Sequence, residues 1–83
     1  MSIEVRYFAS LREQLGERES LAWRPGLTLG ALRDALVARG GAHARALARE
    51  RVLRCALNQR MSEEGAEVPD GAEVAFFPPV TGG

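Results

Sequence analysis

One segment of the chain has a strong helical pattern, and it limits the folds that the rest of the chain can adopt. In "LGALRDALVAR", Leu29, Leu32 and Leu36 recur at the spacing that places them on one face of a helix. Thr28 stands at the N-cap position, and Gly40-Gly41 follow as a termination signal. Because this is the clearest helix in a short chain, we expect its apolar stripe to be buried against a sheet.

The segments on both sides of this helix have the properties of strands. In "IEVRYF", Ile3, Val5 and Tyr7 alternate with polar residues, which is the periodicity of a strand with one buried face. "ESLAWR" ends at Pro25-Gly26, "LRCALN" runs into Asn58-Gln59, and a Pro-Asp-Gly turn precedes "EVAFF". Strands are therefore predicted at residues 3–8, 19–24, 53–58 and 73–77.

Two shorter helices are also predicted. Ser10 can cap the first, with Glu13 reaching back as in a capping box, and Gly16 ends it. The second is predicted from "HARALARER", residues 43–51. The arginines of the chain are scattered among acidic residues, which predicts a solvated surface.

Size, composition and charge exclude several classes of protein. Eighty-three residues, 46% of them apolar, make one small globular domain. The formal net charge is zero, so nucleic acids and anionic membranes are not expected partners. No apolar run approaches the roughly 20 residues of a membrane span, and the first residues lack a signal-peptide pattern. Together with a single cysteine, Cys55, these features predict a cytoplasmic location.

The sequence contains no pattern typical of a catalytic or metal site. His43 has no second His, Cys or Asp at ligand spacing, so we expect no metal site. No Ser/His/Asp or Cys/His set is present, and Cys55 lies in a predicted strand, where we expect it to be part of the core. We therefore expect the chain to bind no cofactor and to have no enzymatic activity on its own.

The elements follow the order strand, strand, helix, strand, strand, which predicts the α+β class. A mixed sheet packed on one main helix, with the short helices beside it, is the economical way to bury their apolar faces. This arrangement matches the β-grasp fold, the ubiquitin-like architecture, in which the first and last strands are usually neighbours. We predict a β-grasp domain at residues 1–77 and an extended tail at residues 78–83.

The predicted tail has the features of a segment that enters another protein. Pro78-Pro79 cannot donate hydrogen bonds to a sheet and favour a stiff polyproline conformation. Fully extended, residues 78–83 reach roughly 20 Å, and Gly82 and Gly83 have no side chain. The α-carboxylate of Gly83 is a poor electrophile, but adenylation by ATP would allow a sulfur donor to convert it to a thiocarboxylate. The catalytic groups for that chemistry would belong to partner proteins.

Three large apolar residues are predicted on the polar side of the sheet. Phe8 is in phase with Arg6 in the first strand, and Phe77 is in phase with Glu73 in the last. Met61 follows a turn, where a polar residue would be expected. Exposed apolar residues that gather in this way predict a surface for a partner protein.

Three segments of the chain resemble one protein family. They are "DGAEVAFFPPVTGG" at residues 70–83, "VRYFASLRE" at residues 5–13, and "CALNQRM" at residues 55–61. The first resembles the C-terminal signature of the small subunit of molybdopterin synthase, a family of β-grasp sulfur carriers. The other two are similar to that family's opening strand with its short helix, and to its middle strand.

The resemblance implies a mechanism and a set of partners. A ubiquitin-activating-like adenylyltransferase would use ATP to adenylate Gly83, and a sulfurtransferase relay would convert it to a thiocarboxylate. The tail would enter the large subunit of molybdopterin synthase and donate sulfur to cyclic pyranopterin monophosphate, which forms the dithiolene of molybdopterin. The family assembles as a heterotetramer with catalytic residues on the large subunit. The residues implied for insertion are Val80, Thr81, Gly82 and Gly83, and those for partner contact are Phe8, Met61 and Phe77.

Other functions remain open at the level of the sequence. Related carriers deliver sulfur to a thiazole or to thiolated tRNA, and they share the fold and the Gly-Gly end. Ubiquitin-like modifiers are joined to lysines of other proteins through the same end. A plain interaction domain with an inert tail is the third alternative.

Overall fold

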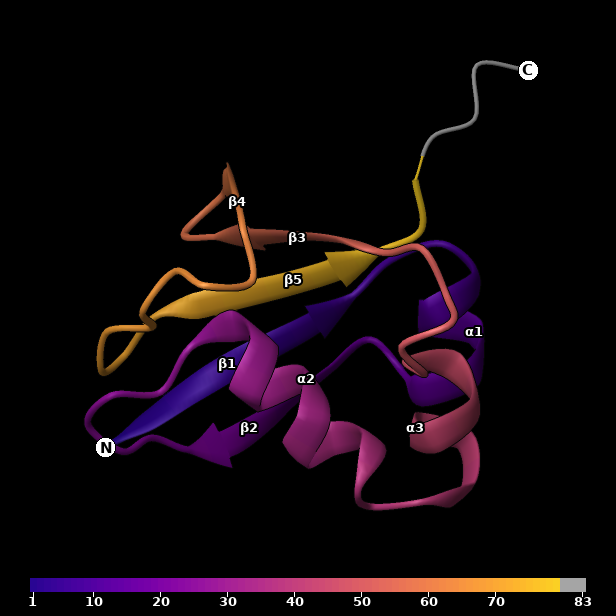
Figure 1. Cartoon of the computed structure of the whole chain (residues 1–83), viewed down its shortest axis with the longest axis horizontal. Coiled ribbons are helices and arrows are strands. Elements are labelled where there is room, and N and C mark those ends of the chain that lie inside the picture. The colour runs from indigo at the N-terminus through magenta and orange to yellow at the C-terminus, as the bar shows by residue number, and fades with distance from the viewer. Residues whose placement is uncertain (80–83) are drawn as a thin grey trace.

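The computed structural model describes residues 1–79, which form five strands and three helices (Figure 1). The strands are β1 (Ser2–Tyr7), β2 (Arg18–Ala22), β3 (Arg54–Leu57), β4 (Arg60–Ser62) and β5 (Glu73–Phe77). The helices are α1 (Ser10–Leu15), α2 (Leu29–Val37) and α3 (Gly41–Ala46). The four predicted strands and the main helix are confirmed, while β4 was not predicted. The second short helix begins two residues before the predicted range and ends five residues before its end.

The strands form one mixed sheet in the order β2-β1-β5-β3-β4. β1 and β5 are parallel, with Val5 opposite Val74, whereas the other neighbouring pairs are antiparallel. The predicted contact between the first and last strands is therefore confirmed. The α2 helix, which comes after β2 and before β3 in the chain, packs across one face of the sheet (Figure 1). This topology is the predicted β-grasp arrangement.

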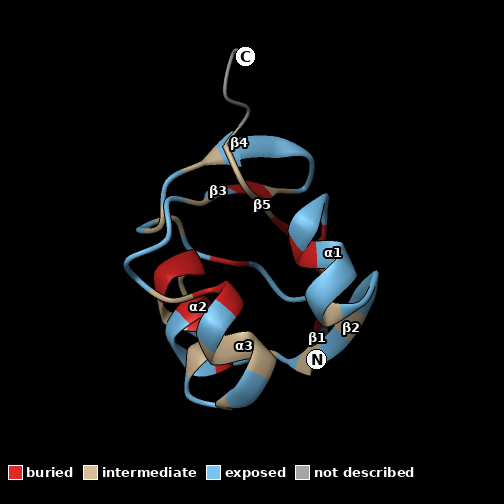
Figure 2. Ribbon diagram, turned by 90° about the vertical axis from the view of Figure 1, so that its right-hand side faces the viewer, coloured by how far each residue is buried: buried red, intermediate tan, exposed pale blue. Residues whose placement is uncertain are grey.

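The core lies between the helices and one face of the sheet, and Figure 2 shows buried segments on α2 and on the central strands. Alternation along β1 and β5 directs one set of side chains to this face, which we call the inner face. The predicted helix stripe packs against them and is buried. The core side chains from these three elements are Ile3, Val5, Tyr7, Leu29, Leu32, Leu36, Val74 and Phe76.

The two predicted helix caps have different outcomes. The Thr28 side chain accepts a hydrogen bond from the Ala31 N–H, which confirms the N-cap of α2. The predicted capping box of α1 is wrong, because Ser10 is already inside the helix and Ala9 is the N-cap, with no side-chain hydrogen bond. Ala9 has a φ of 55°, and backbone carbonyls accept from the first helical N–H groups, so a capping side chain is not needed.

Arg33 is buried inside the domain, which corrects the expectation that the arginines form a solvated surface. Its Nε donates to the Leu47 carbonyl at 2.8 Å, and its Nη2 donates to the carbonyls of Ala48 and Arg51. Nη1 forms an ion pair with Glu64 at 2.8 Å. All three nitrogens are therefore partnered, which joins α2 to the segments that follow α3 and β4.

The turn at Asn58-Gln59 produces a strand that the sequence pattern did not show. Both residues have positive φ angles, 49° and 69°, as in a tight hairpin turn of the type I′ class. The chain therefore reverses at once and Arg60–Ser62 pairs with β3. This pairing places Met61 opposite Ala56, on the face of the sheet away from the helices.

Candidate functional site

The tail predicted to carry the chemistry begins at the end of β5. Phe77 is the last residue of that strand, and Pro78 and Pro79 follow it without regular structure. Neither proline has an N–H to continue the sheet, which explains why the pairing ends here. The predicted tail positions Val80, Thr81, Gly82 and Gly83 lie outside the described residues.

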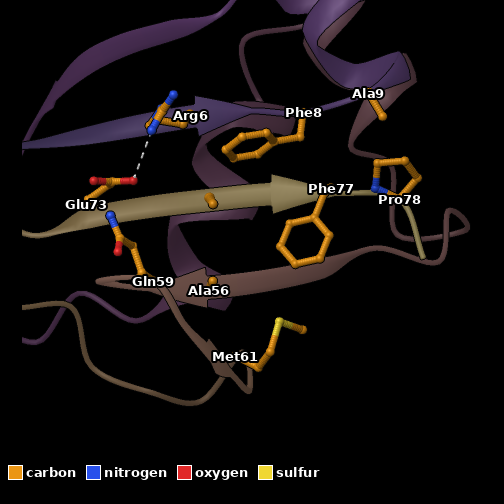
Figure 3. A pocket seen from close by; sticks show the side chains of 10 residues that line it. Arg6, Phe8, Ala9, Ala56, Gln59, Met61, Glu73, Phe77 and Pro78 are labelled. Carbon is orange, nitrogen blue, oxygen red and sulfur yellow. Dashed lines mark hydrogen bonds and ion pairs between the residues drawn. The ribbon is translucent and has the colours of Figure 1, made fainter. Parts of the chain in front are cut away.

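The sheet face opposite the helices, here called the outer face, has a hollow next to the start of the tail. Across the sheet, Arg6 pairs with Ala75, Ala75 with Ala56, and Ala56 with Met61. The side chains of the two alanines are short and those of Arg6 and Met61 are long, so the surface of the sheet dips in the middle of this row. The hollow above them has a volume of about 570 Å³. Figure 3 shows the side chains that line it, which include Phe8 and Phe77 beside the alanine floor.

The three residues predicted for partner contact gather around this hollow. Phe8 and Phe77 pack edge to face, with their ring centroids 6.3 Å apart. Met61 is 56% exposed and Phe8 is 37% exposed, while Phe77 is half-buried between them and the sheet. The structure therefore brings together the predicted residues on one surface, and their role in binding stays a prediction.

Arg6 lies at the other end of the hollow, and the sequence did not single it out. Its guanidinium carbon is 5.2 Å from the centre of the Phe8 ring, which is the range of a cation–π contact. Its Nη1 lies 3.5 Å from a carboxylate oxygen of Glu73. Its Nε is buried and has no hydrogen-bond acceptor among residues 1–79. The signal was present, because Arg6 is in phase with Phe8 in the first strand.

The inner face has its own polar cluster at the edge formed by β2. Glu19 accepts hydrogen bonds from the Tyr7 hydroxyl at 2.7 Å and from Arg39 at 2.5 Å, and it contacts His43 at 2.9 Å. Burial favours protonation of Glu19, but these hydrogen bonds outweigh it and lower its pKa to about 2. Burial, and then the Glu19 carboxylate, raise the pKa of Tyr7 far above its ordinary value. The cluster holds α3 against the sheet and has no opening onto the outer-face hollow.

Cys55 lies in the core, as the sequence predicted, and His43 belongs to the polar cluster at the β2 edge. Cys55 is a free, buried thiol, and burial raises its pKa, which keeps it in the unreactive form. His43 contacts Glu19 and the edge of the Tyr7 ring. In residues 1–79, no group of three His, Cys, Asp or Glu side chains is placed to hold a metal ion. None of the helices in this range has the length and apolar character needed to span a bilayer.

A protein-family model identifies the family to which this chain belongs. The model of the ThiS family matches residues 5–83, which is nearly the whole sequence. The chain belongs to the ThiS family. The matched range includes the β-grasp domain and the residues after Pro79 that the sequence singled out.

Within the ThiS family, the chain is similar to sulfur carriers and to a protein modifier. It is 40% identical to the molybdopterin synthase sulfur carrier subunit of Escherichia coli, over 98% of this chain and 99% of that one. It is 27% identical, with a TM-score of 0.69, to a chain in the complex of subunits 1 and 2 of molybdopterin-converting factor from Helicobacter pylori, and the match covers both chains fully. Small archaeal modifier protein 1 of Haloferax volcanii is 28% identical, with a TM-score of 0.76, over 95% of this chain and 98% of that one.

Proposed function

We propose that this chain is the sulfur carrier subunit of molybdopterin synthase. The observation that carries the proposal is the 40% identity to the E. coli carrier subunit along almost the full length of both chains. The similarity to one chain of a two-subunit converting-factor complex supports a large subunit as its partner. The α-carboxylate of Gly83 is the group that carries sulfur.

The carrier is activated in two steps by partner enzymes. An adenylyltransferase joins the Gly83 carboxylate to AMP from ATP and releases pyrophosphate. A persulfide on a sulfurtransferase then attacks the carbonyl and displaces AMP, which leaves an acyl disulfide. A thiol reduces the disulfide bond and releases the thiocarboxylate. Glycine suits this sequence because no Cβ crowds the carbonyl during attack.

The tail, now carrying the thiocarboxylate, then delivers its sulfur inside the large subunit. The thiocarboxylate sulfur attacks an oxygen-bearing carbon of cyclic pyranopterin monophosphate, and that carbon–oxygen bond breaks, which leaves a thioester between the tail and the pterin. Water then cleaves the acyl–sulfur bond, so that the sulfur stays on the pterin and Gly83 returns to a free carboxylate. The dithiolene needs two sulfurs, which accounts for a heterotetramer with two carriers and two large subunits. Residues 80–83 enter the large subunit, and the catalytic side chains belong to that subunit.

The outer face positions the tail for this delivery. Phe8, Met61 and Phe77 bind the large subunit, and Phe77 lies one residue before the two prolines. A contact at Phe77 therefore fixes where the tail starts, and the prolines limit the directions it can take. The folded domain binds the large subunit, and the tail carries the reactive group.

Intact mass spectrometry tests the proposal. Incubation with the adenylyltransferase, the sulfurtransferase and ATP should give a species heavier by one oxygen-to-sulfur exchange. Deletion of Gly83, or extension of the chain beyond it, should abolish that species and the conversion of the pterin by the purified synthase. A Gly83 deletion variant that still completes the dithiolene would refute the proposal.

Protein modification is a second candidate, because one similar solved structure is that of a small archaeal modifier protein. In this role the adenylated Gly83 would form an isopeptide bond with a lysine of a target. All eleven basic residues of this chain are arginine, so it offers no lysine side chain for further rounds of attachment. Isopeptide-linked adducts in a cell lysate, absent from a strain with the Gly83 deletion, would support this role.

A further inference from the structure

Arg6 is a charged side chain of the hollow that has donors without an acceptor in residues 1–79. Of its three guanidinium nitrogens, Nη1 faces Glu73 at 3.5 Å, which is long for an ion pair with hydrogen-bond character. Nε is buried and has no acceptor within residues 1–79. A buried donor without a partner destabilises a protein, so this arrangement is unusual unless a partner supplies the acceptor.

One edge of the guanidinium has no acceptor among residues 1–79. Glu73 takes the Nη1 side, and the guanidinium carbon lies over the Phe8 ring. The opposite edge presents Nε–H and one N–H of Nη2 in parallel, which is the fork that a carboxylate binds with both oxygens. A single carbonyl oxygen would use one of these two donors and leave the other unpaired.

The charges of the outer face also favour an acidic group. Arg54 pairs with Phe77 in the register and therefore points to the same face, and it has no ion pair in residues 1–79. On this face Arg6 and Arg54 accompany Glu73 and its cross-strand neighbour Glu4, and Glu4 is already paired with Arg18. The floor between Arg6 and Met61 is apolar, since it consists of Ala56 and Ala75.

We propose that the hollow is a two-part docking site on the carrier, in which the Nε edge of Arg6 binds a carboxylate of the large subunit. An apolar side chain adjacent to that carboxylate in the large subunit occupies the space over Ala56 and Ala75. The aromatic pair Phe8 and Phe77 supplies affinity, and Arg6 sets the register, because a planar fork accepts a carboxylate in one orientation. This inference rests on the proposed function, since it names the chemistry of the same partner.

The test compares two identical substitutions on one sheet face, measured as the dissociation constant of the full-length carrier and its large subunit. Arg6→Met keeps the apolar stem over Phe8 and removes the guanidinium. Arg18→Met is the control, because Arg18 lies opposite Arg6 on β2 but is exposed, pairs with Glu4 and does not line the hollow. We expect Arg6→Met to weaken binding by about ten- to a hundredfold and Arg18→Met to change it by less than about threefold.

Two further measurements separate recognition from folding. Binding of the wild type should weaken as salt is raised, and the Arg6→Met variant should lose part of that dependence. Arg6→Lys keeps the charge without the fork and should restore only a fraction of the affinity. Thermal unfolding should show no loss of stability in any of the three variants, because Arg6→Met removes a buried donor that has no acceptor in residues 1–79 and Arg18 is exposed.

Equal binding by Arg6→Met and the wild type, with unchanged salt dependence, would overturn the docking site. The same result would leave the proposed function standing if the Gly83 thiocarboxylate still forms and the synthase still converts the pterin. Absence of any binding between the wild-type carrier and the large subunit would overturn both. A charge exchange, Arg6→Glu with the partner carboxylate changed to arginine, should recover affinity and would identify the partner residue.

Discussion

The two sides of the sheet treat an arginine in opposite ways. On the inner side, Arg33 has partners for all three of its nitrogens, three backbone carbonyls and Glu64. On the outer face, Arg6 has one long contact to Glu73 and a buried Nε without an acceptor in the described chain. Polar groups that hold a fold are satisfied within it, whereas an unsatisfied one on an open face is available to a partner.

The same contrast applies to the adjacent phenylalanines of β5. Phe76 points to the inner face and is 1% exposed, while Phe77 points to the outer face and is half-buried. One belongs to the core and the other to the hollow, although they are neighbours in sequence. A substitution at each position should therefore affect different properties of the protein.

The largest expected effect is on the inner side. Arg33→Met should destabilise the domain by roughly 3–5 kcal/mol, because it removes the donor to the Leu47, Ala48 and Arg51 carbonyls and one of the two arginine partners of Glu64. Urea unfolding followed by circular dichroism measures this change. Arg49→Met also removes a contact to Glu64, but Arg49 is half exposed, so a loss below about 1 kcal/mol is expected. Similar losses for the two variants would mean that the burial of Arg33 adds nothing to the stability of the inner side.

A smaller effect, in a different quantity, is expected on the outer face. Phe77→Asp should weaken assembly with the large subunit by about 2–3 kcal/mol, as for a central interface residue, and should change the unfolding free energy by less than about 1 kcal/mol. Phe76→Ala is the matched comparison and should lose about 3 kcal/mol of stability through the cavity it creates. Isothermal titration calorimetry and urea unfolding separate the two. Normal partner binding by Phe77→Asp would contradict the assignment of the docking surface.

An effect that appears only in acid concerns the polar cluster at the β2 edge. The pKa of Glu19 is lowered from 4.5 to about 2, so its contribution to stability is complete above pH 4.5 and is lost as the pH falls toward 2. The loss should be on the order of 3 kcal/mol. Glu19→Gln should remove this part of the acid dependence. An unchanged acid limb in that variant would mean that other carboxylates, such as Glu64, control it.

Local patterns were enough to predict the elements that repeat a period or have a strong cap. The alternation in β1, the leucine stripe with Thr28, and the turn before β5 each combine several signals, and they located the sheet and the main helix. The position of Phe8 and Phe77 on the outer face followed from phase, and that of Met61 from its place after a turn. Phase shows which face a side chain occupies and does not show what it touches, so the low alanine floor was not predicted.

The parts that were missed depend on contacts between distant segments. Arg33 is adjacent to Leu32 on the helix and close to the apolar stripe, but its burial depends on carbonyls 14 to 18 residues away. β4 has only three residues, and its existence follows from the positive φ angles of Asn58 and Gln59. At the start of α1, the backbone carbonyl of Ala9 accepts hydrogen bonds from the helix, so no capping side chain is needed. The types of side chain in the sequence do not reveal this backbone geometry.

The place of β5 in the sheet has a consequence for damaged copies of the protein. β5 is the middle strand, hydrogen-bonded to β1 on one side and to β3 on the other. A chain cut before Glu73 lacks β5, so β1 and β3 lose their shared partner and the domain should unfold. A cut after Pro79 spares every strand and leaves the docking hollow intact. Under the proposed function, proteolysis upstream should remove a carrier from competition, while a chain trimmed at its last few residues should still bind the large subunit and, without sulfur to deliver, inhibit it.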